Sequence, residues 1–298
     1  LEHTEHLPED ITVDGLVRMG FEWLSGREER EEWSHVWRAL LEHTEHLPED
    51  ITVDGLVRMG FEWLSGREER EEWSHVWEKL LEHQQHLPEN IPVSQLLYAG
   101  FLWVKKDSDK KDWAFIWEKI LDNFRLTKNI KEAEFLQIGY DWLLNNKQHD
   151  SWSFIYEQFL IRRLDKKPFL NMGVDWLCEN SHRPEAYGIA IGIIKLMTNV
   201  TEDQRVVIWS IEWLDSNYHH PSWTFLWGAL WNALPTMRIF NLIIPWINSR
   251  PKKGIFWVLE VVQKKGTEEM VNEIKNWANN NPDHPLSEAV IEKITDEN

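Results

Sequence analysis

Cysteine is nearly absent from this sequence, and its 14 glycines and 12 prolines are scattered without forming a linker. The one cysteine, Cys178, excludes an internal disulfide, and so low a content is typical of a reducing compartment. No lysine or arginine lies within three residues of Cys178. A thiol without a nearby cation is usually unreactive, so we expect Cys178 to be a buried structural thiol.

Long apolar runs and positive charge are also scarce. The longest nearly apolar stretch, residues 187–197, is interrupted by Lys195 and is about half as long as a bilayer-spanning helix. Lysine and arginine number 32 against 50 aspartates and glutamates, which gives a formal net charge of −18. Nucleic acids and anionic membranes would be repelled by this charge. We therefore expect no nucleic-acid partner, no membrane and a cytoplasmic location.

Motifs of common active sites are missing too. The chain contains no G-x-x-x-x-G-K-[ST] loop for nucleotide phosphates and no G-x-S-x-G nucleophile turn. The acidic run Glu28–Glu32 precedes an expected helix, where negative charge favours the helix dipole. We expect no catalytic residue, no cofactor and no enzymatic activity. The chain begins at Leu1, inside a repeat and without methionine, so we also expect residues upstream.

Histidine pairs recur along the chain but lack further metal ligands. They are His3 and His6, His43 and His46, and His83 and His86. Each pair has the i, i+3 spacing that can face one ion on a helix. Because no cysteine or fixed third ligand lies nearby, and because histidine is favoured at helix C-termini, we expect no metal site.

Tryptophan is abundant, since the chain contains 20 of these residues, and most of them recur at fixed positions of a tandem repeat. Residues 1–37 are identical to residues 41–77, so the period is 40. One anchor tryptophan recurs to the end of the chain, at Trp23, Trp63, Trp103, Trp142, Trp176, Trp213, Trp246 and Trp277. A second anchor begins ten residues later as a pair of aromatic residues, at Trp33 and Trp37, Trp73 and Trp77, Trp113 and Trp117, Trp152 and Tyr156, and Trp223 and Trp227.

These anchors predict about eight repeats, which shorten to about 31–37 residues toward the C-terminus. The repeats span approximately residues 1–40, 41–80, 81–120, 121–160, 161–197, 198–233, 234–266 and 267–298, the last one capping a single repeat domain.

Each repeat has the apolar periodicity of two helices. The first helix has one apolar face formed by Val13, Leu16, Val17, Gly20 and Leu24, and the second has one formed by Trp33, Val36, Trp37, Leu40 and Leu41. A single helix pair cannot bury both faces, whereas stacked pairs can. The sequence therefore predicts an all-α solenoid of helix–turn–helix repeats, without strands.

Residues at the expected helix ends agree with this division. Asp10, Asp50, Asn90 and Asn129 precede the first helices and are predicted to be N-caps, with Glu132 completing a capping box. Gly26 and Gly66 are predicted to end the first helices.

Glycine also recurs inside the first helices, at Gly20, Gly60, Gly100 and Gly139. Glycine within a helix costs about 1 kcal/mol relative to alanine, so a repeated glycine implies a repeated gain. We expect each one to admit a neighbouring helix or tryptophan ring, and the anchor tryptophans to fill the core. Trp209 and Trp231 lie outside both anchor columns and are candidate functional tryptophans.

The outward stripe of the first helices is the predicted partner-binding surface. It consists of Asp14, Arg18, Glu22, Asp54, Arg58, Glu62, Tyr98 and Leu102, at i, i+4 and i+8 spacing opposite the apolar face. The alternative interpretation is a solvated face with helix-supporting ion pairs.

Two further segments carry a family resemblance. Residues 220–230 (His-Pro-Ser-Trp-Thr-Phe-Leu-Trp-Gly-Ala-Leu) and 151–156 (Ser-Trp-Ser-Phe-Ile-Tyr), with the G-[FY]-x-W-L anchor upstream, resemble the Trp-rich repeats in C-terminal arrays of bacterial STAND-type NTPases. These are the NACHT and NB-ARC relatives of NOD-like receptors, and the unit is broadly similar to tetratricopeptide repeats. The resemblance implies an upstream NTPase switch domain, with this array as its ligand sensor in bacterial defence signalling.

The leading hypothesis is thus a sensor module that binds a protein or other ligand. The main alternative is a static protein–protein scaffold, similar to those built from half-a-tetratricopeptide repeats. A hydrolase with a site hidden between helices is a third hypothesis. The exact duplication is a recent amplification or an engineered one.

Overall fold

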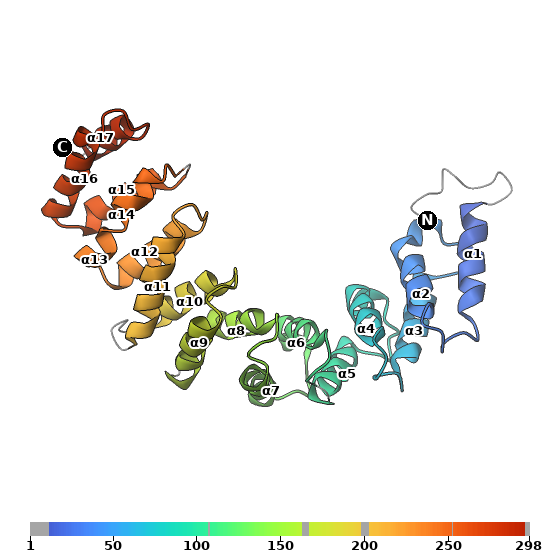
Figure 1. Cartoon of the computed structure of the whole chain (residues 1–298). Helices are drawn as coiled ribbons and strands as arrows, with labels where there is room; N and C mark the ends of the chain where they lie inside the picture. The colour runs from blue at the N-terminus through green and yellow to red at the C-terminus, as the bar shows by residue number, and fades with distance from the viewer. Residues whose placement is uncertain (1–11, 107, 163–166, 198–202, 252, 296–298) are drawn as a thin grey trace. The chain divides into compact units, whose positions relative to one another are not determined.

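The computed structural model describes residues 12–106, 108–162, 167–197, 203–251 and 253–295 (Figure 1). Within these ranges the chain is all-helical and contains no strand, and neighbouring helices pack in succession. The predicted α-solenoid class is therefore confirmed. The chain falls into two compact parts, residues 1–146 and residues 147–298, and the division lies between the two helices of the fourth repeat.

The N-terminal part follows the predicted helix pairs. Its helices are α1 (Val13–Leu24), α2 (Trp33–Glu42), α3 (Val53–Leu64), α4 (Trp73–Glu82), α5 (Val93–Lys106), α6 (Trp113–Asp122) and α7 (Glu132–Asn145). Short 3₁₀ turns follow the second helices, at Thr44–His46, Gln84–His86 and Phe124–Leu126. The helices α2 and α4 each pack against the first helix of their own repeat and against that of the next, so the core runs from repeat to repeat.

The C-terminal part continues the pattern with one interruption. Its helices are α8 (Trp152–Ile161), α9 (Lys167–Glu179), α10 (Ala186–Leu196), α11 (Gln204–Ser216), α12 (Trp223–Ala233), α13 (Met237–Phe240), α14 (Ile243–Asn248), α15 (Ile255–Lys265), α16 (Glu268–Asn280) and α17 (Ser287–Thr295). Two short helices, α13 and α14, replace one first helix. Pro245 explains the break, because proline clashes with the carbonyl four residues earlier, at Asn241.

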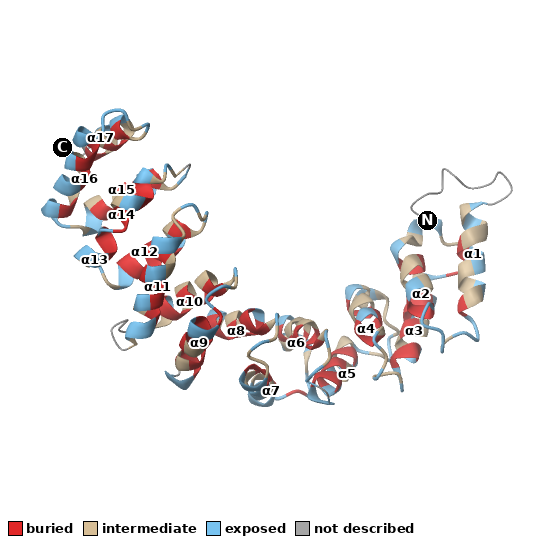
Figure 2. Ribbon diagram, viewed as in Figure 1, coloured by how far each residue is buried: buried red, intermediate tan, exposed pale blue. Residues whose placement is uncertain are grey.

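Buried residues recur on every described helix, whereas the turns are mostly exposed (Figure 2). Most anchor tryptophans are fully buried, including Trp33, Trp73, Trp113, Trp152 and Trp223. Their rings stack in pairs across repeats. In the N-terminal part Trp73 lies 5.5 Å from Trp103, and Trp113 lies 5.0 Å from Trp142.

Helix ends confirm one prediction and correct another. Gly26 and Gly66 follow α1 and α3 with φ of 71° and 75°, a left-handed conformation that favours glycine. The predicted N-caps are wrong where the structure describes them. The hydroxyls of Thr12 and Thr52 cap α1 and α3 by accepting from the N–H groups three residues on, because Asp50 lies two residues too far upstream. Asn90 and Asn129 likewise lie outside the helices, Glu132 begins α7 after Lys131, and Asp10 is outside the described residues.

Tryptophan serves here as a helix cap as well as a core residue. The last carbonyls of a helix have no partner within it. The indole N–H groups of Trp33, Trp73 and Trp113 donate to such carbonyls, those of Leu24, Leu64 and Val104, over 3.1, 3.1 and 2.7 Å. Trp223 does the same for Leu214 in the C-terminal part. A phenylalanine would fill the space without satisfying the carbonyl.

The helix glycines Gly60, Gly100 and Gly139 have the predicted role, whereas the prediction is wrong for Gly20, which no ring or helix approaches closely. A Cβ added at Gly100 would lie 2.7 Å from Cζ2 of Trp77, and one at Gly139 would lie 2.5 Å from Cζ2 of Trp117. The Trp77 indole reaches this position because its N–H donates to the Leu96 carbonyl over 2.8 Å. Each of these three glycines therefore admits the second anchor tryptophan of the preceding repeat.

The anchor Trp227 keeps its core position but departs from this arrangement. Trp227 is fully buried on α12, and its indole N–H donates to the Ile239 carbonyl of α13 over 3.2 Å. No glycine occurs between residues 229 and 253, so the short helices that follow offer no glycine to admit this ring. The Trp227 ring instead stacks on Trp231 at 5.4 Å and meets the edge of Trp257 at 6.3 Å. The contact between second anchor and glycine is therefore lost where the first helix is broken.

Alanine at Gly20 and at Gly60 is expected to change stability in opposite directions, although the surrounding sequence is identical. A Cβ at Gly20 would lie 3.6 Å from Leu40 and Val36, so Gly20→Ala should stabilise the chain by about 1 kcal/mol. A Cβ at Gly60 would lie 2.7 Å from Cε2 of Trp37, so Gly60→Ala should destabilise it by about 1–3 kcal/mol. Denaturant titration of both variants tests this, and a stabilising Gly60→Ala would contradict the packing role.

Candidate interaction surface

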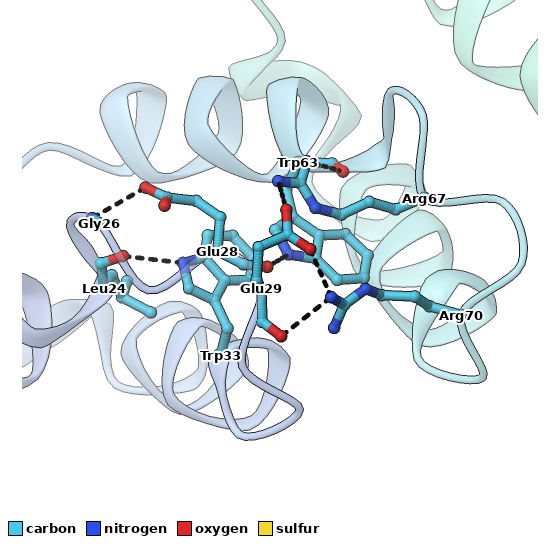
Figure 3. Close-up of polar contacts among 8 residues, drawn as sticks. All are labelled: Leu24, Gly26, Glu28, Glu29, Trp33, Trp63, Arg67 and Arg70. Atoms are coloured by element: carbon cyan, nitrogen blue, oxygen red, sulfur yellow. Dashed lines mark hydrogen bonds and ion pairs between the residues drawn. The ribbon is translucent and has the colours of Figure 1, made fainter.

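The junction between the first two repeats combines a stack of tryptophan rings with a set of ion pairs (Figure 3). We call these ion pairs, between Glu29 of the first repeat and Arg67 and Arg70 of the second, the clasp. The Trp63 ring stacks on Trp33 at 5.4 Å, and its indole N–H donates to the Glu28 carbonyl over 2.9 Å. The Glu29 carboxylate accepts from Arg67 over 2.7 Å and from Arg70 over 2.6 Å. These two guanidinium groups lower the pKa of the Glu29 carboxyl.

The same clasp recurs at later junctions with different side chains. At the next junction Glu69 pairs with Lys106 and Lys110, and Lys110 also donates to the Glu68 carbonyl. In the C-terminal part Arg183 donates to the Gln148 carbonyl over 2.9 Å and lies 3.3 Å from Asp150. This recurrence shows that the clasp joins one repeat to the next. The charged residues of the clasp therefore hold adjacent repeats together.

The predicted stripe of first helices is exposed along its whole length. Asp14, Arg18, Glu22, Asp54, Arg58, Glu62, Tyr98 and Leu102 all have exposed side chains. Two of them are engaged within the array, because Arg18 donates to both Asp50 carboxylate oxygens and Asp54 lies 2.9 Å from His86. The stripe is accessible, but its charged groups are partly used in joining neighbouring repeats.

Three expectations about single residues are wrong. Trp209 and Trp231, the candidate functional tryptophans, are buried, so neither offers a surface to a partner. Cys178, expected to be buried, has an exposed side chain on α9. Partial desolvation nevertheless raises the pKa of its thiol, with Arg205 opposing the shift. The two tryptophan errors have one cause, since the neighbouring repeat decides which side of a helix is covered. The Cys178 expectation rested on neighbours in the sequence, whereas Arg205 approaches the thiol from elsewhere in the chain.

The histidine pairs lie just after the second helices. The rings of His43 and His46 are 6.4 Å apart, and those of His83 and His86 are 6.3 Å apart. Among the described residues, no three His, Cys, Asp or Glu side chains gather where they could hold a metal ion. His3 and His6 lie outside the described residues.

An unpredicted feature is a set of exposed aromatic rings on second helices of the C-terminal part. Phe154 on α8, Phe225 on α12 and Trp257 on α15 are 36%, 67% and 43% exposed. Each is the third residue of its helix. The sequence carried a signal for two of them, because Phe154 and Phe225 stand midway between anchor aromatics. A residue two positions after a buried anchor lies about 200° around the helix, on the opposite side.

The corresponding positions in the N-terminal part are more polar. They hold His35, His75 and Phe115, and Lys119 lies over the Phe115 ring at 5.2 Å. Charge differs in the same way, since residues 1–146 contain 31 acidic and 16 basic residues, whereas residues 147–298 contain 19 and 16. On the second helices, the exposed aromatic rings thus belong to the C-terminal part, and the excess negative charge belongs to the N-terminal part.

No family model matches this chain, and no curated protein or solved structure is significantly similar to it. None of the helices in the described ranges combines the length and hydrophobicity needed to cross a membrane. The likeness to STAND-type arrays accordingly rests on the repeat motifs alone.

Proposed function

We propose that this chain is a protein-binding module whose partner contacts the second helices of the C-terminal part. The observation that supports this proposal most directly is that an exposed aromatic ring recurs at the same position of α8, α12 and α15. Exposed aromatic side chains on a rigid scaffold are typical of interfaces, where they bury much area at little entropic cost. Buried anchors on the opposite side of the same helices, such as Trp152, Trp223 and Trp227, hold the rings in place.

The wider setting is part of the same proposal. The Trp-rich motifs favour a sensor array within a larger bacterial STAND-type signalling NTPase. In that setting partner binding would shift an upstream nucleotide-driven switch. A P-loop followed by the rest of a nucleotide-binding domain, upstream in the complete gene, would support the sensor; its absence would favour the static scaffold.

A comparison of surface variants tests the binding module. The chain is used to capture partners from the cells that encode it, beside the double variant Phe154→Ser/Phe225→Ser. We expect a stoichiometric partner on the native chain and at least a tenfold loss on the variant, because each substitution removes exposed apolar area from the contact.

The matched control is Leu144→Ser/Ile208→Ser, which changes two exposed apolar residues on the first helices α7 and α11. This variant should retain the partner. Circular dichroism confirms that all three proteins have the same helicity. Equal retention by both double variants would contradict a binding surface on the second helices.

A further inference from the structure

One carboxylate on the second-helix surface has no bonding partner in the part of the chain that the structure describes. Glu157 is on α8, one helical turn after Phe154, and its side chain is half-buried. Its Oε1 lies over the neighbouring helix α10, because a Cβ added at Gly188 would lie 3.0 Å from it. No hydrogen bond or ion pair within the described residues engages Glu157. Other carboxylates of the array, such as Glu29 and Glu69, are each held by two cations.

No cation among the described residues stabilises the charge of Glu157. Burial raises the pKa of its carboxyl, and the nearby charge of Glu185 raises it further. Glu185 itself lies 3.8 Å from Arg183, whose closer contacts are to Asp150 and Gln148. A partly desolvated carboxylate without a counter-ion is unfavourable, and a cation from a partner would relieve it.

Apolar surface lies on both sides of this carboxylate. Phe154 and Ile161 share its face of α8, at i−3 and i+4, and Ile161 is 71% exposed. On α10 the position equivalent to Phe154 is Gly188, so no side chain projects from the surface there. On α12 the equivalent position is Phe225, again an exposed ring. The helix α10 packs against both α8 and α12, so the three helices form one surface.

We propose that the surface of α8, α10 and α12 binds a linear segment of a partner protein in which a lysine or arginine is flanked by apolar side chains. The cation pairs with Glu157 beside the Phe154 ring, and the apolar side chains contact Phe225 and Ile161. A ring next to a carboxylate suits a cation, which gains a cation–π contact as well as an ion pair. The C-terminal part, with 19 acidic and 16 basic residues, is itself weakly acidic and does not repel such a basic segment. This inference rests on the proposed function and specifies the chemistry of the partner.

Fluorescent model peptides test the proposal with the full chain. The probe is a peptide of alternating lysine and leucine, compared by fluorescence anisotropy with a glutamate–leucine peptide and a lysine–serine peptide. We expect the lysine–leucine peptide to bind most tightly. Glu157→Gln, which keeps the shape and removes the charge, should weaken its binding about tenfold. Phe225→Ser should weaken it by a similar factor.

Matched variants on the first helix α11 separate this surface from general attraction to an acidic protein. Glu212→Gln and Ile208→Ser change an exposed carboxylate and an exposed apolar side chain, and each should alter binding less than about twofold. Equal effects of Glu157→Gln and Glu212→Gln would overturn the proposal, as would equally tight binding of the glutamate–leucine peptide. If Phe154→Ser/Phe225→Ser releases a cellular partner but Glu157→Gln does not, the cationic contact is wrong and the binding module stands.

Discussion

Trp63→Ala is expected to lower the free energy of unfolding by about 3–5 kcal/mol, the usual cost of deleting a large core aromatic. The Trp63 side chain is 2% exposed, stacks on Trp33 within 6° of parallel, and donates to the Glu28 carbonyl. The substitution removes the ring and leaves that carbonyl without its donor. Equilibrium denaturant titration followed by circular dichroism measures the loss.

The chain supplies its own control, because Trp23 has the same local sequence as Trp63. Trp23 is only half-buried, and no aromatic ring among the described residues stacks on it. Trp23→Ala should therefore cost about 1–2 kcal/mol, well below the cost at Trp63. A loss under about 1 kcal/mol at Trp63 would mean that its ring is accessible, and would favour a role in ligand binding over one in the core.

Deleting residues 41–80 is expected to leave a folded, soluble and fully helical protein. The deletion removes one whole period and joins Leu40 to Leu81, so α2 takes the place of α4 against α5. Trp37 then occupies the space above Gly100, where Trp77 now lies, and its N–H meets the Leu96 carbonyl. The free energy of unfolding should fall by the contributions of one repeat and one interface, about 2–6 kcal/mol for 40 residues.

The junction contacts support this expectation because their partners recur. In the shortened chain Glu29 would take the position of Glu69 and pair with Lys106 and Lys110. Within the period only two positions differ, Arg38 against Glu78 and Ala39 against Lys79. The ion pairs of Lys79 are with exposed carboxylates, whose contribution is small.

An out-of-period deletion is the control for this experiment. Removing residues 43–72 takes away α3 and joins α2 directly to α4, so two second helices would meet without a first helix between them. This variant should lose helicity and aggregate. Aggregation of the in-period variant instead would show that repeats depend on contacts beyond their nearest neighbours.

Local sequence determined the helices of this protein. The 3.6-residue apolar pattern ran from Val13 to Leu24 and from Trp33 to Leu41, close to the observed bounds of α1 and α2, and Gly26 marked the turn between them. Such features depend on residues within one or two turns of the chain, so they can be read without knowing the neighbours. The repeated glycines, such as Gly60, also indicated a close approach by a neighbouring helix or a tryptophan ring, because a costly glycine on an apolar face needs a compensating gain.

Tertiary structure alone decided what covers each helix. Gly20 and Gly60 have identical surroundings in the sequence, yet only Gly60 lies against a tryptophan ring. Periodicity also could not distinguish a buried Trp231 from an exposed Trp257. Nor could it distinguish Glu29, held by two arginines, from Glu157, which has no partner among the described residues. Burial and charge pairing in a repeat array are set by the adjacent repeat. That contact joins residues about 20 to 40 positions apart, as for Gly60 with Trp37 and Glu29 with Arg70, beyond the reach of any local pattern.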